Sequence, residues 1–205
     1  LKSITSILQH GLFWHGVRNN LARLGLDFMP YYWSKAISSD IIPQKLKTDN
    51  NEFKLSVFDE TELKYIKNII IGIEEKDFFE DLRNGEKCLG LKFNEEIVAY
   101  MLIRKKSFHF RKHYFNISEA ESYLHSMYTF EKYRGKGIAP FLMSCCFEYL
   151  EKEGITNYYG IAEYFNKSAI KFQNKLNFKH EKLILSIVLF KKWTMNFELK
   201  KYSVF

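Results

Sequence analysis

The chain reads Tyr133-Arg134-Gly135-Lys136-Gly137-Ile138-Ala139 where an alternating apolar segment gives way to a strongly helical one. This pattern predicts a strand that turns directly into a helix. Gly135 and Gly137 let the backbone turn tightly and approach a ligand closely. The N–H groups of the first helical turn, aided by the helix dipole, then form an anion site suited to a phosphate or pyrophosphate. Pro140 fits that first turn, where a missing N–H costs little.

Two better-known phosphate motifs are excluded at this position. A dinucleotide-binding turn needs a third glycine and normally lies early in the chain, and a Walker A loop needs Gly-Lys followed by Ser or Thr. Neither pattern is present. Glycine-rich turns also occur for packing alone, so the surrounding elements must decide what this turn does.

Strand and helix patterns alternate from residue 52 onward. Phe53, Leu55 and Val57 alternate as a strand, and Asp59 with Glu62 forms a capping box that begins a helix. This order predicts an α/β (α+β) fold, with a mixed, mostly antiparallel central sheet and helices on both faces. The other expected elements are a helix at 76–82, strands at 87–93 and 97–104, a strand at 122–130, a helix from 138 to about 154, a strand at 158–162, a helix at 167–176 and strands at 180–190 and 194–202.

The first 50 residues differ from the rest and are expected to form a helical appendage and linker to a domain at 51–205. Helical spacing of Ile4, Leu8, Leu12, Val17, Leu21 and Leu24 predicts a basic amphipathic helix, interrupted or weakened at Gly11 and Gly16. An aromatic cluster, Met29-Pro30-Tyr31-Tyr32-Trp33, and a polar linker follow. The helix is either a membrane-surface or partner-binding element, or, as we favour, an arm on its own domain or on a second subunit.

Composition excludes several classes of protein. Of the 205 residues, 46% are hydrophobic and only 3 are proline, so the chain is not disordered, collagen-like or of low complexity. A net charge of +7 suits an anionic partner, or reflects a lysine-rich proteome. The chain has no run of ~18 apolar residues and no signal-peptide pattern. The chain has an odd number of cysteines, three, and two of them, Cys145 and Cys146, are sequence neighbours that do not easily form a bridge. A disulfide framework is therefore not expected, which indicates a reducing cytoplasm.

Two motifs in register resemble a known family. Arg134-x-x-Gly137-x-Ala139 resembles the pyrophosphate-binding signature of the GNAT superfamily of N-acetyltransferases, Arg/Gln-x-x-Gly-x-Gly/Ala. A second segment looks like that superfamily's next motif, and element order and spacing both match over about residues 52–202. Its matching residues are Asn166, Ala169, Ile170, Phe172, Leu176, Asn177 and Phe178.

The resemblance implies where acetyl-CoA binds. In this superfamily the strand before the motif carries a bulge and splays from the next strand, and the pantetheine arm lies between them. Residues Met127, Tyr128 and Thr129 would contact the pantetheine arm. Asn166 would either form a hydrogen bond with the arm or only cap its own helix. The turn would hold the pyrophosphate through Arg134, Gly135, Lys136, Gly137, Ile138, Ala139 and Pro140. No metal is expected.

The catalytic groups do not carry over. The usual acid, a tyrosine, corresponds to Phe172, which cannot donate a proton and is expected near the thioester. Asn177 stands where the family usually has a glycine, and Ile161 stands where the family often has a carboxylate. The candidates for a base are His125 on the splayed strand, then Glu163 and Tyr164 beyond the neighbouring strand. His125 is preferred, since an imidazole titrates near ~6.5 and would share a face with Met127 and Thr129 unless a bulge intervenes.

A basic and aromatic segment at 104–115 falls where this superfamily often builds part of its acceptor site. Phe108 and Phe110 alternate with basic residues, which a plain hairpin also explains. The segment is either that hairpin or an acceptor wall for an anionic or nucleotide-linked substrate. It lacks the larger basic face of a nucleic-acid binder, so no nucleic-acid partner is expected.

The resemblance implies an N-acetyltransferase that uses acetyl-CoA as acyl donor. The expected acceptor is a primary amine of a small molecule, such as an amino-sugar of surface polysaccharide synthesis. A protein amine or a polyamine is the enzymatic alternative. A non-catalytic acyl-CoA-binding scaffold is the alternative from another class, and Phe172 favours it. We leave open a homodimer and a peripheral-membrane or subunit contact through the N-terminal helix.

Overall fold

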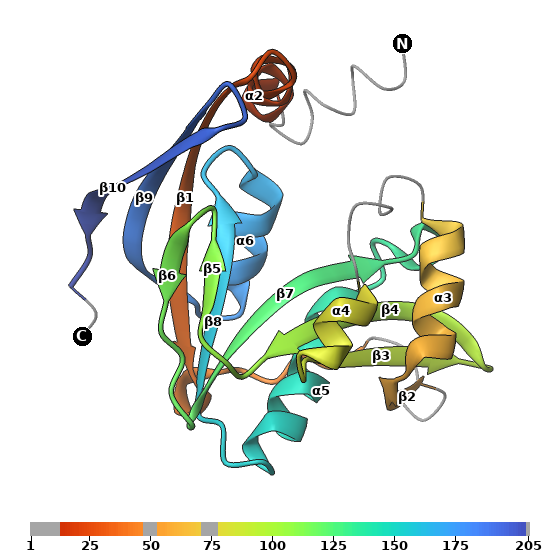
Figure 1. Cartoon of the computed structure of the whole chain (residues 1–205). Helices are drawn as coiled ribbons and strands as arrows, with labels where there is room; N and C mark the ends of the chain where they lie inside the picture. The colour runs from red at the N-terminus through yellow and green to blue at the C-terminus, as the bar shows by residue number, and fades with distance from the viewer. Residues whose placement is uncertain (1–12, 47–52, 71–77, 204–205) are drawn as a thin grey trace. The chain divides into compact units, whose positions relative to one another are not determined.

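The computed structural model describes residues 13–46, 53–70 and 78–203, and the chain folds into two compact units (Figure 1). The first unit consists of Leu1–Ile42, Ser107–Ile117 and Asn157–Phe205. The second consists of Pro43–Lys106 and Ser118–Thr156. Each unit is built on its own set of antiparallel strands.

The second unit is a four-stranded antiparallel sheet in the order β7-β4-β3-β2. Residues Asn94 and Glu95 both have positive φ at the β3–β4 turn, the backbone that a tight two-residue hairpin needs. The turn expected near Asn94 is therefore confirmed. The strands are β2 (Phe53–Phe58), β3 (Lys87–Phe93), β4 (Glu96–Arg104) and β7 (Glu121–Thr129).

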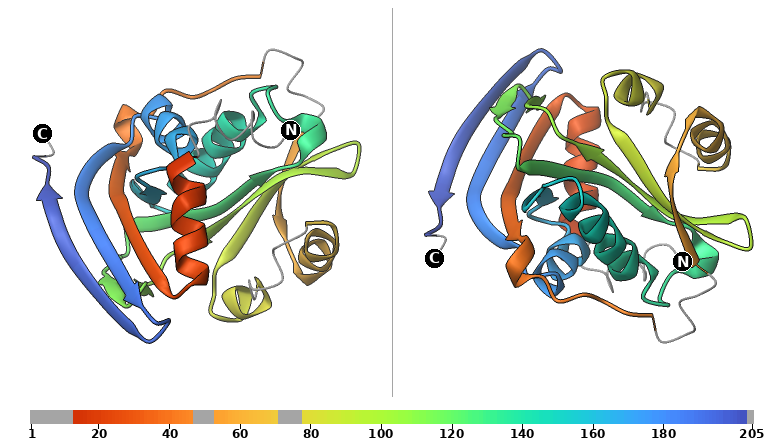
Figure 2. Two further views of the ribbon diagram at one scale, coloured as in Figure 1. Left: turned by 90° about the horizontal axis from the view of Figure 1, so that it is seen from above. Right: turned by 90° about the horizontal axis from the view of Figure 1, so that it is seen from below.

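Helices cover both faces of this sheet (Figure 2). Helices α3 (Glu60–Ile69) and α4 (Phe78–Arg83) lie on one face, and α5 (Ile138–Glu151) lies on the other. The expected capping box starts α3: Asp59 accepts from Thr61 N, and Glu62 accepts from Asp59 N. On the α3–α4 face the core contains Phe58, Leu63, Ile66, Phe78, Tyr100 and Leu102.

The first unit has four antiparallel strands in the order β10-β9-β1-β8. A short hairpin and two helices accompany them. The added Cβ of an alanine at Gly160 would lie 2.7 Å from Gln173 Nε2, so α6 packs tightly over β8 at this glycine. The elements are α2 (Phe13–Arg23), β1 (Leu26–Ile37), β5 (Phe108–Phe110), β6 (His113–Phe115), β8 (Asn157–Glu163), α6 (Lys167–Lys175), β9 (Lys179–Leu189) and β10 (Trp193–Lys201).

Strand β1 corrects the expectation for residues 26–37. The aromatic cluster expected in an appendage is a strand that pairs with both β8 and β9. Its aromatic rings form much of the unit's core: Trp33 stacks on Tyr159 at 4.6 Å between ring centroids, and Tyr31 meets Phe110 edge-on at 5.2 Å. The expected domain boundary near residue 50 stays a prediction.

The N-terminal helix also differs from its expected form. Helix α2 runs through Gly16 without interruption, because its tertiary contact with β1 outweighs the low helical propensity of glycine. The part of the expected helix before residue 13 lies outside the described residues. The described helices include none long and apolar enough to cross a membrane.

One face of the β1-β9-β10 strands carries an uncharged ladder of side chains. Cross-strand pairing places three residues on each of three rungs. Four of the nine side chains are exposed, from 42% for Met195 to 56% for Trp193. We call this surface the apolar ladder. Its rungs are Leu26–Leu189–Trp193, Phe28–Ile187–Met195 and Pro30–Leu185–Phe197.

The expected fold class is confirmed. The protein is a mixed α/β structure whose paired strands run antiparallel and whose second unit carries helices on both faces of its sheet. The hairpin expected from residues 104–115 is also present, as β5 and β6.

Candidate functional site

The turn before α5 has the backbone that the glycine pattern predicts. Gly135 has φ +76° and Gly137 has φ +81°, a left-handed conformation that residues with a side chain rarely adopt. Gly137 is the N-cap of α5, and no side chain bonds the first turn. The first N–H groups of a 14-residue helix therefore point outward at the loop, with the positive end of the helix dipole behind them.

Space above the two glycines is open. A Cβ added at Gly135 meets nothing within 4 Å, and one added at Gly137 meets only Leu46 Cδ2 at 3.8 Å. Neither glycine is therefore required by protein packing. A left-handed backbone with open space and outward N–H groups is what a close-lying phosphate requires.

The loop also carries two basic side chains, Arg134 and Lys136. Arg134 is half-exposed, donates from Nε to Thr129 O at 3.0 Å and lies over the Tyr128 ring. Lys136 is exposed and lies 5.5 Å from the centroid of the Tyr133 ring. The loop thus offers two cations and no carboxylate in the first helical turn, which suits an anionic ligand. Ile138 is buried and anchors the helix, while Ala139 and Pro140 are partly exposed.

Strand β7 carries a bulge that changes the expected face of His125. Tyr128 pairs with Tyr100 and His125 pairs with Leu102, so two residues of β7, Ser126 and Met127, oppose Met101. His125 therefore shares a face with Tyr128, and Met127 and Thr129 point to the other face. The expectation that His125 shares a face with Met127 and Thr129 is wrong, and the bulge is the reason.

His125 belongs to a cluster of charged side chains on the α4 side of the sheet. Its Nε2 lies 2.8 Å from Glu86 Oε2, and its ring stacks on Tyr123. Arg104 donates to the other oxygen of Glu86. Burial, with help from the nearby Glu86 charge, raises the pKa of Asp81, and this outweighs the opposing effects of His125 and Arg104.

The two other candidate bases lie in the first unit. Glu163 ends β8, is 8% exposed, and accepts from Arg18 Nη1 at 2.8 Å. Tyr164 follows it, is 37% exposed, and stands beneath the Lys167 ammonium. The Glu163 carboxylate is therefore held in an ion pair, whereas the Tyr164 ring is accessible.

The second motif forms helix α6 and its two ends. Asn166 caps α6, since its Oδ1 accepts from Ala169 N at 3.0 Å, so its capping role is established. Phe172 is half-buried on α6 and has no hydroxyl to donate. Asn177 has φ +61° just beyond the helix. Asparagine is the residue that best tolerates this backbone after glycine, which explains the departure from the family pattern.

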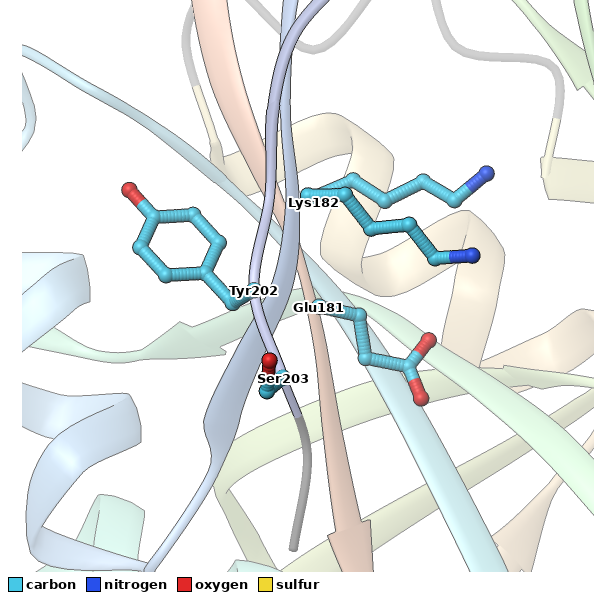
Figure 3. Close-up of a pocket in the computed structure, with 5 residues that line it drawn as sticks. Glu181, Lys182, Tyr202 and Ser203 are labelled. Atoms are coloured by element: carbon cyan, nitrogen blue, oxygen red, sulfur yellow. The ribbon is translucent and has the colours of Figure 1, made fainter.

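A pocket of the first unit lies away from these groups. It measures about 440 Å³ and is lined by residues of β9 and of the chain's C-terminal end. In Figure 3 the Lys182 and Glu181 side chains extend to one side of the strands and the Tyr202 ring to the other. Lys182 of this pocket pairs with Glu198. The described residues also contain no group of three or more metal-ligating side chains.

Sequence reasoning missed Glu86 and Ser126. Glu86 lies 39 residues before His125 and becomes its partner only through the β3–β4–β7 sheet. Ser126 matters because of the bulge, which leaves no mark on the local sequence. Both residues belong to the second unit, as does the glycine loop.

The comparison with protein families agrees with this geometry. The profile of the acetyltransferase (GNAT) family matches residues 47–178. The chain belongs to the GNAT acetyltransferase family. No curated protein matches the sequence significantly.

Solved structures show the same fold. One is a GCN5-related N-acetyltransferase from Kribbella flavida, with TM-score 0.55, 11% identity and coverage of 82% of this chain and 62% of that one. Another is a GNAT-family acetyltransferase from Colwellia psychrerythraea, with TM-score 0.57, 13% identity and coverage of 80% and 57%. The chain spans less than two thirds of each, and identities this low establish the fold alone.

Proposed function

We propose that the protein transfers an acetyl group from acetyl-CoA to a primary amine of a small molecule. The observation that carries the proposal is the open, left-handed Gly135–Gly137 loop at the N-terminus of α5. The outward N–H groups would bind the pyrophosphate of CoA, and Arg134 and Lys136 would add positive potential. Family membership supports acyl transfer in general.

In the proposed reaction a neutral amine attacks the thioester carbonyl directly. Backbone N–H groups of β7 near Met127, Tyr128 and Thr129 would bind the arm and stabilise the developing oxyanion. The tetrahedral intermediate loses a proton from its nitrogen and expels the CoA thiolate, which leaves the amide; the thiolate takes up a proton to give CoA. An ammonium cannot attack, so a base must first remove its proton.

His125 is the base we propose. It is half-buried, is oriented by Glu86, and lies on the strand that leads into the phosphate loop. Replacing it with alanine should lower kcat/KM by roughly 10²-fold and remove the acidic limb of the pH profile. Affinity for acetyl-CoA should be unchanged. A near-normal rate would move the proposal to Tyr164 or Glu163.

The acceptor is proposed to be an amino-sugar of surface polysaccharide synthesis. The β5–β6 hairpin supports this class, since it presents the half-exposed Phe110 and the exposed Tyr114 beside basic residues. Aromatic rings stack well on sugars and bases. A protein amine or a polyamine is the alternative. Release of CoA from acetyl-CoA, measured over a panel of amino-sugars, polyamines and peptides, discriminates among them.

A non-catalytic acyl-CoA-binding scaffold is the second candidate, and Phe172 favours it. A tyrosine there would donate a proton to the leaving thiolate, and phenylalanine cannot. Saturable binding of acetyl-CoA with no amine-dependent CoA release over the whole panel would establish the scaffold. Steady turnover with any amine would exclude it.

We also propose a homodimer in the cytoplasm, formed through the apolar ladder. Among the described strands, β10 is the last of its sheet. A partner must present a similarly uncharged surface, and a second copy does so when the two ladders pack face to face across a two-fold axis. The exposed Trp193, Met195 and Phe197 would be buried in such a contact. Contact of α2 with a membrane surface remains an alternative.

A further inference from the structure

Both ring nitrogens of His125 are engaged within the protein. Nε2 lies 2.8 Å from Oε2 of Glu86, and Nδ1 lies 3.0 Å from Oγ of Ser126. The ring is held in this position by stacking on Tyr123, with an interplanar angle of 6°. A base whose two nitrogens are both occupied reaches a substrate proton only through one of its partners.

The chemistry of the partners decides which nitrogen carries the proton. Glu86 is 4% exposed and also forms an ion pair with Arg104. A carboxylate only accepts, so His125 donates Nε2–H to Glu86. The lone pair of Nδ1 then accepts the hydroxyl hydrogen of Ser126. The order Glu86–His125–Ser126 thus runs from a buried anion to a half-buried hydroxyl.

The backbone at Ser126 is strained. Its φ of +52° lies in the left-handed region, which is unfavourable for a residue with a side chain. Ser126 is also one of the two bulge residues opposite Met101. Bulges redirect side chains next to active sites, and this one directs the Ser126 hydroxyl to His125 Nδ1.

We propose that Ser126 is the group that meets the acceptor amine and relays its proton to His125. This inference rests on the proposed acetyl transfer. Ser126 Oγ takes a proton from the substrate ammonium as its own hydroxyl proton passes to His125 Nδ1. The O–H bond broken at Ser126 is replaced by a new one, the amine becomes neutral, and the imidazolium is stabilised by Glu86. The proton then passes to the CoA thiolate or to solvent.

The same three groups would also suit a serine nucleophile that forms an acyl-enzyme. The relay is favoured because an amine attacks a thioester without an intermediate, whereas an acyl-serine adds a second transfer. The two differ in one observable. An acyl-serine forms with acetyl-CoA in the absence of amine, and a relay leaves the protein unmodified.

Two substitutions remove the hydroxyl of Ser126 but differ in backbone strain, which alanine keeps and glycine relieves. Ser126→Ala keeps the Cβ, and Ser126→Gly relieves the left-handed backbone, so a folding defect cannot explain a loss shared by both. Both should lower kcat/KM by roughly 10²-fold at neutral pH and leave acetyl-CoA affinity unchanged. Ser122→Ala is the matched control, a buried serine on the same strand, and should act as wild type.

The pH profile separates a relay from a structural role. Above the pKa of the acceptor amine, most of the amine is already neutral and needs no base. The Ser126 variants should therefore regain most of the wild-type rate at high pH, and Glu86→Gln should show the same recovery. A rate deficit that is the same at every pH would overturn the relay.

Two further outcomes are decisive. An acetylated intact mass after wild-type protein meets acetyl-CoA alone, lost in Ser126→Ala, would replace the relay by a nucleophile. Wild-type rates and pH dependence in both Ser126 variants would refute any role for the hydroxyl. Failure of the proposed function itself looks different, because wild-type protein would then release no CoA with any amine.

Discussion

Arg18 donates from Nη1 to Oε2 of Glu163 at 2.8 Å, and this contact ties helix α2 to the end of strand β8. The same guanidinium binds both oxygens of Asp27, at 2.6 and 2.9 Å, and Arg111 of the β5–β6 turn also donates to Asp27. Four elements of the first unit therefore meet at two carboxylates and two guanidinium groups. Glu163 acts in this network as an ion-pair acceptor, which makes it a weaker candidate for a base than His125.

Arg18→Ala should destabilise the protein by about 3 kcal/mol, because it leaves two largely buried carboxylates without their shared cation. Chemical denaturation measures the loss. Arg23→Ala is the matched control, since Arg23 lies on the same helix but is exposed, and its effect should stay within about 0.5 kcal/mol. Equal effects of the two substitutions would mean that the Arg18 network contributes nothing to stability.

Stability at acid pH should depend on Glu153. Burial raises its pKa, but hydrogen bonds from Lys105 and Lys87 outweigh that effect and lower the pKa to about 2. A lowered pKa contributes stability above the unfolded value of ~4.3, and this is lost as the pH falls toward 2. Between these values Glu153→Gln should lose stability less steeply than wild type in denaturation experiments. If the free energy of unfolding falls equally steeply with pH in both proteins, the contacts of Glu153 with Lys87 and Lys105 are not maintained in solution.

Phe172→Tyr should leave the fold intact, since Phe172 is half-buried on α6 and the hydroxyl can reach solvent or ligand. If protonation of the thiolate limits the rate, the added donor raises kcat with little change in KM. Steady-state kinetics and thermal unfolding measure the two effects. A variant that unfolds instead would identify Phe172 as a core residue and invalidate its alignment with the family's tyrosine.

Phe197→Glu should convert a dimer to a monomer, because it places a charge on the apolar ladder, at an exposed side chain of its end rung. Sedimentation velocity measures the change. Asn174→Glu makes the same change of charge at an exposed position on α6 and should leave the dimer intact. A monomeric wild-type protein would rule out the dimer, and a dimer that survives Phe197→Glu would rule out this surface.

The elements from residue 53 onward could be predicted because their patterns are local. The Asp59–Glu62 capping box, the turn at Asn94 and the cap at Asn166 are each visible within four residues of sequence. The Gly135–Gly137 turn was predictable for the same reason. Its two glycines precede a periodic helix, and only glycine readily takes the backbone that the turn requires.

Strand β1 could not be predicted because both of its faces are largely apolar. Tyr31 and Trp33 pack under the hairpin, while Phe28 and Pro30 belong to the ladder, so no alternation appears. Proline also normally argues against a strand between two neighbours. Tertiary pairing with β8 and β9 outweighs both signals.

The face of His125 and its two partners could not be predicted either. Alternation along β7 fails at Ser126, where one extra residue turns every later side chain to the opposite face. Glu86 reaches His125 only because β3, β4 and β7 lie in one sheet. The chemistry of the site thus depends on register, which composition and spacing do not encode.

Binding of acetyl-CoA to the Gly135–Gly137 loop tests the central claim most directly. Gly137→Val places a branched side chain where the pyrophosphate would approach, and isothermal titration calorimetry measures the affinity. Gly154→Val is the matched control: its φ of +80° imposes the same backbone strain just beyond the other end of α5, and no atom lies within 4 Å of its added Cβ. We predict at least ~10-fold weaker binding for Gly137→Val and wild-type affinity for Gly154→Val. Equal affinities in all three proteins, or no binding to wild type, would contradict the assignment.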